Sequence, residues 1–510
     1  MSGSITVDPH FDTVRPEPQL KTRAIKGATL AITGQIASFI IQTTGTILLA
    51  RLLAPHDFGL VAMVLAFSML LQNLGCNGFV EAVVQRKEIN HRQISTLFWI
   101  NAGLGLLLAL IFWACAPAIA WFYQNPELKP IVAVMGLSIL FGGLSNQHVS
   151  LLVRNMRFLR TTGNEVTAAF TSTAIAIGMA WWGCGHWALV AKWLLAPLMI
   201  TLGAWLLCDW RPGLPSRNAE VRPLLRYALH TYGNFIMTYF RRNADKMLVG
   251  RSFGSLQLGY YDRAYQLSNM LPTQIVSPLN SVSLATFSRL SSDAGGFRQN
   301  YLKVLSIFAF VGMPLSAALT LSSGDIILLL LGPQWAASEK IFRVFGPCIG
   351  VAILYITHGW LHLSLGRPDR WFRWSIVEFI VTALCFAAGY PFGAFGVAVG
   401  FSLSFYLLIG PALWYAGKPI HLRFSSVLFA VWRYFLSALV SGLLSWYFLY
   451  CFAPVAAMYG TLPILIRLAV AAALCISMYL GIITALFQGL QPIRQCAAIL
   501  RDLIHKEPRD

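Results

Sequence analysis

The chain has 510 residues, of which 57% are apolar and only 11% are charged, and its mean hydropathy is +0.63. A soluble domain carries about 25% charged residues, so this composition excludes an ordinary soluble protein and indicates an all-α integral membrane protein. The net charge of +18 would suit a nucleic acid. Membrane proteins, however, collect Lys and Arg on their cytoplasmic loops, and we expect no nucleic-acid partner.

The nine Cys stand singly along the chain, without a CxxC pair or the Cys/His spacing of a metal site. Most of them fall within apolar runs, where Cys packs as a small hydrophobic side chain. The sequence therefore predicts no metal centre, no disulfide framework and no cofactor.

The chain divides into a tail, apolar runs and a second tail. Residues 1–26 are polar and Pro-containing, which predicts a disordered cytoplasmic tail. A membrane-spanning helix needs about 20 apolar residues, and fourteen such runs follow: 28–50, 58–80, 95–121, 129–152, 161–183, 187–208, 224–250, 256–284, 300–322, 338–364, 371–389, 393–416, 429–451 and 462–488. The polar residues within 224–250 and 256–284 make these two runs the weakest by hydropathy.

These runs predict two six-helix lobes followed by two C-terminal helices. The predicted regions are an N-lobe over 27–210, a C-lobe over 211–417, the last two spans over 418–490 and a cytoplasmic tail over 491–510. No connecting loop exceeds roughly twenty residues, which leaves no room for a catalytic domain outside the membrane.

The positions of the 38 Lys and Arg predict that both termini are cytoplasmic. With the N-terminus inside, the outer loops carry only Arg51, Lys129, Arg251 and Lys340, and every inner segment carries more cations than any outer one. This asymmetry is the one that the positive-inside rule describes. It also accounts for most of the net charge.

Two matches within the chain indicate an internal repeat. A shift of 200 residues places Leu48, Arg51, Gly59, Ser68 and Leu71 on Leu248, Arg251, Gly259, Ser268 and Leu271. A shift of 213 places Arg154, Arg157, Arg160 and Glu165 on Arg367, Arg370, Arg373 and Glu378. Arg triplets are common on inner loops, but the Glu at the same offset favours a repeat. Six spans per unit predict a pseudo-twofold axis along the membrane normal and a cavity between the lobes.

Polar residues recur at helical spacing in the first and seventh spans and are predicted to line this cavity. They are Gln35, Ser38, Gln42 and Thr46 in the first span, and Asn234 and Thr238 in the seventh. A polar stripe on an intramembrane helix faces protein or water rather than lipid. Polar packing between helices is the alternative interpretation.

Charged residues are concentrated at Arg241, Arg242, Asp245 and Lys246, inside the seventh span. An ionisable group near the bilayer centre costs on the order of 3 kcal/mol or more, so it is kept away from lipid. Three cations against one anion favour a negatively charged cargo, and arginine forks bind phosphate well.

Further charged groups lie at Asp262 and Arg263 in the eighth span and at Glu165 and Glu378, one turn into spans five and eleven. We predict substrate binding by Arg241, Arg242, Lys246 and Arg263. Asp245 and Asp262 then balance the charge or bind a coupling ion, H⁺ or Na⁺. A closed ion-pair network between the helices is the alternative. Glu165 and Glu378 either pair with the neighbouring Arg triplets or couple transport to protons.

Several motifs carry a resemblance to a known family. The stretch 242–251 (RNADKMLVGR), continuing through 258–267 (LGYYDRAYQL) and 271–272 (LP), resembles the second-half hallmark of the bacterial polysaccharide transporter family. These are the Wzx-type flippases of the multidrug/oligosaccharidyl-lipid/polysaccharide (MOP) superfamily. In the same way 49–55 (LARLLAP) with 58–59 (FG) resembles the opening hairpin, 185–190 (GHWALV) the turn between spans five and six, and 330–335 (LLGPQW) the loop between spans nine and ten.

The resemblance covers roughly 28–420, and the last two spans match only in hydropathy. It looks closest to the branch that exports exopolysaccharides such as colanic acid or succinoglycan. It implies a multi-pass protein of the bacterial inner membrane that moves an undecaprenyl-diphosphate-linked oligosaccharide to the outer leaflet by alternating access. Its implied partners are membrane lipid and that lipid-linked substrate, with polymerase and export machinery as further candidates. The cationic positions vary in the family, so Arg241 and Arg242 rest on the physics of this chain.

Two other functions have to be weighed. A MATE-like multidrug antiporter of the same superfamily usually takes cationic cargo, which favours an acidic cavity, whereas this charged segment is net basic. A polytopic polysaccharide polymerase or glycosyltransferase is an enzyme that generally needs a sizeable outer loop. The outer loops of this chain are short, so we do not expect an enzyme.

Overall fold

In the computed structural model, the described part of the chain is helical and contains no strand. That part comprises residues 17–76, 83, 89–216, 222–490 and 494. Inside its helices, the side chains of 17–26, 28, 73–76, 222–238, 240–242, 277, 278, 281 and 282 are outside the description. The all-α class predicted from composition is confirmed.

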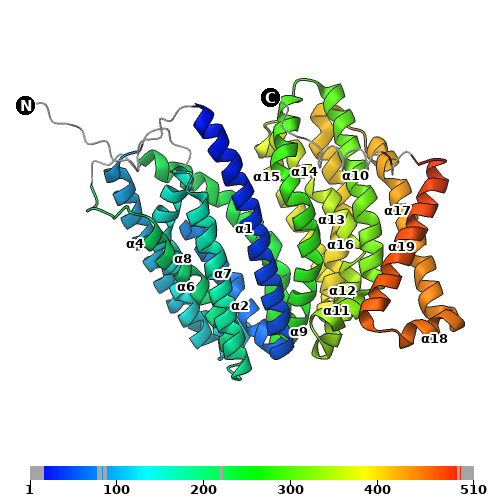
Figure 1. The fold of residues 1–510 in the computed structure, drawn as a ribbon, viewed down its shortest axis with the longest axis horizontal. Helices are drawn as coiled ribbons and strands as arrows, with labels where there is room; N and C mark the ends of the chain where they lie inside the picture. The colour runs from blue at the N-terminus through cyan, green and yellow to red at the C-terminus, as the bar shows by residue number, and fades with distance from the viewer. Residues whose placement is uncertain (1–16, 77–82, 84–88, 217–221, 491–493, 495–510) are drawn as a thin grey trace, which may run out of the picture. The chain divides into compact units, whose positions relative to one another are not determined.

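The first compact unit ends at Gly259. Its helices are α1 (Glu17–Leu52), α2 (Pro55–Cys76), α4 (His91–Ala114), α5 (Ala116–Tyr123), α6 (Leu128–Arg154), α7 (Phe158–Trp181), α8 (His186–Leu207) and the first part of α9 (Arg222–Arg289). Helix α6 packs against α2, α4 and α8, while α7 packs against α1 and α8 (Figure 1). Helix α1 begins at Glu17, inside the stretch expected to be a disordered tail.

Local sequence signals explain where two of these elements start or turn. A capping box begins α4, because the Asn90 side chain accepts from Gln93 N at 2.9 Å and the Gln93 side chain accepts from Asn90 N at 3.2 Å. Helix α9 is interrupted at Gly254, where φ is 81° and ψ is 177°. Only glycine adopts this backbone conformation readily, so α9 consists of two helices that correspond to the seventh and eighth predicted spans.

The second compact unit begins at Tyr260. After the end of α9 it contains α10 (Ala294–Leu321), α11 (Ser323–Leu330), η1 (Pro333–Trp335), α12 (Ala336–Phe345), α13 (Cys348–Ile356), α14 (His358–Ser364), α15 (Pro368–Gly389), η2 (Tyr390–Phe392), α16 (Gly393–Gly417), η3 (Lys418–Ile420), α17 (Phe424–Trp446), η4 (Tyr447–Cys451), α18 (Ala453–Thr461) and α19 (Ile464–Phe487). Helix α10 lies beside α13, α17 and α19, and α15 pairs with α16.

Among the described residues, nine helical segments are long and apolar enough to cross a membrane. One of them, Pro368–Ile420, contains both α15 and α16. A bent pair, Pro333–Phe345 with Cys348–Ser364, adds a tenth candidate at an angle of 56°. The bend falls at Pro347, which lacks a backbone N–H and clashes with the preceding turn. Helix α7 and both parts of α9 are not among the candidates, so the count of fourteen stays a prediction.

The hairpin formed by α1 and α2 and the hairpin formed within α9 meet through glycine. A Cβ added at Gly59 would overlap the carbonyl oxygen of Ser255, and one added at Gly259 would overlap the carbonyl oxygen of Pro55. The two contacts are related by a shift of 200 residues, because Gly59 corresponds to Gly259 and Pro55 corresponds to Ser255. Residues 55–59 and 255–259 therefore contact each other reciprocally within the first unit.

A second pair of glycine contacts supports the repeat at another position. In the first unit, a Cβ at Gly105 of α4 would lie 3.3 Å from the Cα of Gly143 in α6. In the second unit, a Cβ at Gly312 of α10 would lie 3.4 Å from the Cα of Gly350 in α13. Both positions differ by 207 residues, between the shifts of 200 and 213 that the sequence displays. The same close helix crossing is thus built twice.

Replacing Gly59 by Ala should lower the unfolding temperature of the purified protein. The added methyl group forces α2 away from Ser255, and such overpacking costs about 1–3 kcal/mol. The matched control is Gly103→Ala in α4, where a Cβ would meet nothing within 4 Å and Ala should be neutral or favourable for the helix. Thermal denaturation in detergent measures both. Equal unfolding temperatures for the two variants would show that the crossing tolerates a side chain.

Candidate functional site

The predicted polar stripe of the first span lies on one side of α1. Gln35 and Gln42 are exposed, while Ser38 and Thr46 are half-buried. Gly34 and Gly45 bring a different face of α1 against α7, and the exposed Ile32, Ile36 and Ile40 form a third face. At about 100° per residue, the polar stripe falls between the face packed on α7 and the apolar face. It is therefore not consumed by packing against α7.

The charged segment of the seventh span lies in the first part of α9. The side chains of Asn234, Thr238, Arg241 and Arg242 lie outside the described residues, although the backbone there is helical. Asp245 is buried at 1% exposure, and Lys246 is half-buried. An acid and a base thus share adjacent, largely buried positions on a helix that the sequence places within the membrane.

Contacts within the first unit anchor this part of α9. The Tyr239 hydroxyl donates to the carbonyl oxygen of Ala66 in α2 at 2.8 Å. Asn243 Nδ2 donates to Tyr239 O at 3.0 Å, which returns the amide to its own helix. Further along, a Cβ at Gly250 would lie 2.9 Å from the Tyr123 ring. The charged segment is consequently held between a buried Tyr and a close glycine contact.

Asp262 and Arg263, predicted for the eighth span, lie in the second unit and pair with each other. Arg263 Nη2 donates to Asp262 Oδ2 at 2.8 Å, and Gln266 Nε2 donates to the same oxygen at 2.8 Å. The side chain of Arg263 is only 11% exposed and that of Asp262 only 3%. One of the N–H donors of Arg263 is therefore already used by the neighbouring carboxylate.

Aromatic packing holds this Asp–Arg pair in place. The Tyr261 ring lies edge-on to Phe345 with centroids 5.6 Å apart, and Tyr265 lies edge-on to Phe401 at 5.4 Å. Ser338 Oγ donates to Tyr260 O at 3.0 Å, joining α12 to the same segment. The aromatic residues of the resemblance motif at 258–267 are therefore structural contacts within the second unit.

Two members of the first Arg triplet and one member of the second contact residues at or near the ends of neighbouring helices. In the first unit, Arg157 and Arg160 lie 3.3 and 3.8 Å from Asp209, and Arg160 Nη1 donates to Leu207 O at 2.8 Å, at the end of α8. In the second unit, Arg370 Nη2 donates to Tyr415 O at 2.6 Å near the end of α16. Cations are favourable at helix C-termini because the last carbonyl groups point outward.

The two glutamates that follow these triplets differ in their environments. Glu165 is exposed on α7 and forms no ion pair with a described residue. Glu378, at the matching position of α15, is only 5% exposed. One turn earlier on the same face, Trp374 Nε1 donates to the Tyr355 hydroxyl at 3.1 Å. Glu165 and Glu378 hold matching positions in the repeat, but only Glu378 is buried.

Helix α14 of the second unit carries two buried histidines. The His358 and His362 rings are 6.0 Å apart on successive turns of α14, and both residues are at most 6% exposed. The Tyr355 ring lies 4.6 Å from the His358 ring. Glu378 thus belongs to a region that concentrates buried titratable groups, and the sequence analysis missed both histidines.

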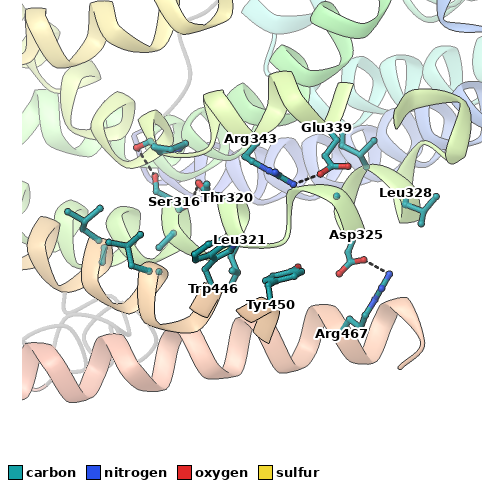
Figure 2. Close-up of a pocket in the computed structure, with 18 of the residues that line it drawn as sticks. Ser316, Thr320, Leu321, Asp325, Leu328, Glu339, Arg343, Trp446, Tyr450 and Arg467 are labelled. Atoms are coloured by element: carbon teal, nitrogen blue, oxygen red, sulfur yellow. Dashed lines mark hydrogen bonds and ion pairs between the residues drawn. The ribbon is translucent and has the colours of Figure 1, made fainter. Parts of the chain in front are cut away.

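The second unit contains a cavity of about 740 Å³ that was not predicted from the sequence. It opens between α10, α11 and α12 on one side and α17 and α19 on the other. Arg467 Nη2 lies 2.5 Å from Asp325 Oδ1, and Arg343 pairs with Glu339, both at the cavity wall (Figure 2). Arg343 and Arg467 fall within the predicted spans 338–364 and 462–488, but nothing in the sequence pairs Arg467 with Asp325.

The family model described as "Polysaccharide biosynthesis protein" matches residues 48–340, more than half of the chain. The chain belongs to this family. The lipopolysaccharide biosynthesis protein WzxC of Escherichia coli (strain K12) is 25% identical over 77% of this chain and 82% of its own length. The succinoglycan biosynthesis transport protein ExoT of Rhizobium meliloti (strain 1021) is 23% identical over 70% of this chain and 74% of its own length.

Solved structures share the fold. The lipid II flippase MurJ, in an inward closed conformation, matches with a TM-score of 0.70 at 15% identity, covering 90% of this chain and 99% of its own. An inward-facing MATE family transporter of the MOP superfamily matches with a TM-score of 0.57 at 13% identity, covering 79% and 98%. The family resemblance inferred from the motifs is confirmed. The chain is a multi-pass membrane protein of this polysaccharide biosynthesis family.

Replacing Asp262 by Asn should destabilise the protein strongly. The change leaves the Arg263 guanidinium buried without its carboxylate, and losing one partner of a buried pair costs about 3–5 kcal/mol. The exposed pair supplies the control, because Asp209→Asn should cost only about 0–1 kcal/mol. Thermal denaturation of the purified variants measures both, and the double variant Asp262→Asn, Arg263→Gln should regain most of the loss. Equal effects at the two sites would contradict the assignment of a buried pair.

Proposed function

We propose that the protein is a flippase that moves an undecaprenyl-diphosphate-linked oligosaccharide from the cytoplasmic to the outer leaflet of the bacterial inner membrane. Membership in the polysaccharide biosynthesis family supports this proposal, as does the similarity to WzxC, a lipopolysaccharide biosynthesis protein, and to ExoT, a succinoglycan biosynthesis transport protein. The observation that carries it is the charged segment of α9, where Asp245 is buried and Lys246 half-buried beside two further arginines. Both termini are cytoplasmic in this proposal, and transport proceeds by alternating access.

The chemistry of a diphosphate matches the cations of α9. Arg241 and Arg242 supply planar forks for phosphate oxygens, and Lys246 supplies a compact charge. Arg263 already donates from Nη2 to the Asp262 carboxylate at 2.8 Å, which leaves fewer of its donors for phosphate. The substrate diphosphate is therefore assigned first to Arg241, Arg242 and Lys246.

The uncharged polar side chains have a separate role in this proposal. Gln35 and Gln42 are exposed along α1, and their amides both donate and accept hydrogen bonds. Ser38 and Thr46 add hydroxyl groups along the same stripe, and Asn234 and Thr238 hold corresponding positions in α9. Sugar hydroxyl groups suit such partners, while the lipid tail stays in the bilayer. The released oligosaccharide then passes to polymerase and export machinery.

Removing both arginines should abolish export. In cells that make the polysaccharide, Arg241→Ala with Arg242→Ala should lower export by about tenfold or more, since hydrogen bonds to charged groups are among the stronger ones. Arg241→Lys with Arg242→Lys should restore only part of it, because Lys cannot form the planar fork. The exposed Arg423→Ala, at the start of α17, controls for loss of a positive charge. Secreted polysaccharide is compared at equal amounts of membrane-inserted protein.

Near-normal export by the double Ala variant would remove the proposed substrate site. Drug efflux supported by the wild-type chain, together with unchanged polysaccharide export in its absence, would favour the multidrug antiporter instead. Synthesis of longer glycan chains by the purified protein would favour a polymerase.

Proton coupling is assigned to Glu378. Its 5% exposure gives it the sheltered position that intramembrane proton carriers occupy, whereas Glu165 is exposed. Glu378→Gln should make transport in proteoliposomes independent of an imposed pH gradient, while Glu165→Gln should keep that dependence. Lipid-linked substrate reaching the far leaflet is the quantity measured. Transport that follows a Na⁺ gradient and ignores pH in the wild type would contradict the choice of ion.

A further inference from the structure

We propose that the cavity of the second unit binds one zwitterionic phospholipid, of the phosphatidylethanolamine class. The phosphate of the lipid lies on Arg343 and Arg467, its ammonium group lies on Glu339 and Asp325, and an acyl chain follows the apolar wall. This binding site is separate from the charged segment of α9, and it stands whether or not the proposed transport substrate is correct.

The charged groups stand together at one part of the cavity wall. Asp325 lies on α11, Glu339 and Arg343 on α12, and Arg467 on α19, and all four line the same space. Figure 2 shows the Asp325–Arg467 pair bridging two elements, with the Glu339–Arg343 pair on the facing helix. Two cations and two anions give this wall no net charge.

Both arginines keep donor groups for a ligand. The Arg467 Nε is buried and has no hydrogen-bond partner among the described residues. Arg343 uses Nε on Ser323 Oγ at 3.2 Å and Nη2 on Glu339. A guanidinium has five N–H donors, so each arginine can hold a phosphate oxygen and still keep its carboxylate.

The carboxylates are likewise open to a second cation. Among the described residues, the hydrogen bond to Asp325 Oδ2 is a long one, 3.4 Å from the Tyr459 hydroxyl. The Glu339 carboxylate packs directly against Gly324, where a Cβ would lie 3.1 Å from its Cδ atom, so the glycine is what allows this close approach. Each carboxylate oxygen has two acceptor positions, enough for a bound arginine and an ammonium group.

Charge complementarity selects the lipid headgroup. A purely anionic headgroup would have to approach Asp325 and Glu339 as well as the arginines, and like charges oppose such binding. A headgroup that carries both signs meets a partner for each. Phosphoethanolamine has that chemistry, and its primary ammonium can donate three hydrogen bonds to the carboxylates.

The rest of the wall suits a hydrocarbon chain and opens to the side. Leu439, Leu443 and Trp446 of α17 line the cavity and remain 49%, 58% and 52% exposed. Met313 and Ala438 line it at 3% and 5% exposure. An acyl chain can therefore enter between exposed side chains and contact buried ones. Trp446 and Tyr450 lie near the polar part, as aromatic residues do at the membrane interface.

Native mass spectrometry of the purified full-length protein tests the site. The delipidated protein is incubated with palmitoyl-oleoyl-phosphatidylethanolamine or with the corresponding phosphatidylglycerol, and the bound fraction is measured against lipid concentration. We expect one tightly bound phosphatidylethanolamine and at least about tenfold weaker phosphatidylglycerol binding, the scale of one hydrogen bond to a charged group. Equal affinity for the two lipids would overturn the proposal.

Two variants locate the site without leaving an unpaired charge. Asp325→Asn with Arg467→Gln keeps the shape of that pair and removes both charges, and Leu439→Trp fills the cavity while leaving the ion pairs intact. Both should lower phosphatidylethanolamine binding about tenfold or more. Arg157→Gln with Asp209→Asn, at the exposed ion pair of the first unit, should not.

Unchanged lipid binding by both cavity variants would overturn the assignment. Displacement of phosphatidylethanolamine by an undecaprenyl-diphosphate-linked saccharide would also overturn it, because the cavity would then belong to the transport path. Failure of the proposed transport function alone would leave the lipid binding intact, so the two proposals can fail separately.

Discussion

Close helix contact through glycine is the constraint on which the rest of this molecule depends. In a bilayer, apolar side chains gain little by leaving lipid for another helix, so helices associate mainly through close packing and polar contacts. Gly59 and Gly259 allow two repeat segments to approach until a methyl group would overlap a carbonyl oxygen, and Gly105 with Gly143 and Gly312 with Gly350 also bring pairs of helices close together. Asp262 and Arg263 stand within four residues of Gly259 in α9, so their positions depend on this backbone packing.

The ion pairs of this protein differ in how deeply the surrounding helices bury them. Asp262 and Arg263 are closed on each other within an aromatic cluster, whereas Asp325 and Arg467 join separate helices at a cavity. Arg157 and Asp209 meet at an exposed turn. An Asp–Arg pair therefore stabilises a single helix segment, lines a cavity or lies on the surface, depending on how deeply it is buried.

Much of the fold could be predicted from the sequence because apolar runs, positive loops and the repeat each follow from the membrane environment. Each of the fourteen apolar runs lies mainly on helical backbone in the described part of the chain. The break at Cys115 between α4 and α5 and the division of span ten into α12, α13 and α14 depend on tertiary packing, which hydropathy does not record. The glycine crossings at a shift of 207 were missed because two isolated glycines give no sequence pattern.

The candidate site was less predictable, for physical reasons that particular residues illustrate. Adjacent charges such as Asp262 and Arg263 are visible in sequence, but their mutual hydrogen bond is not, since either could have turned to another helix. Glu165 and Glu378 occupy equivalent repeat positions, yet only Glu378 is buried. Asp325 and Arg467 come from distant segments, so no spacing rule joins them.

The arginines at the turns between helices have a second consequence. The positions of Arg157, Arg160 and Arg370 contribute to the predicted orientation of the chain, since Lys and Arg near the ends of spans bias how a nascent chain enters the membrane. In the structure, Arg160 and Arg370 donate to carbonyl groups at or near the ends of α8 and α16, and Arg157 pairs with Asp209 just beyond α8. The predicted orientation and the packing of these helix ends therefore depend on the same guanidinium groups.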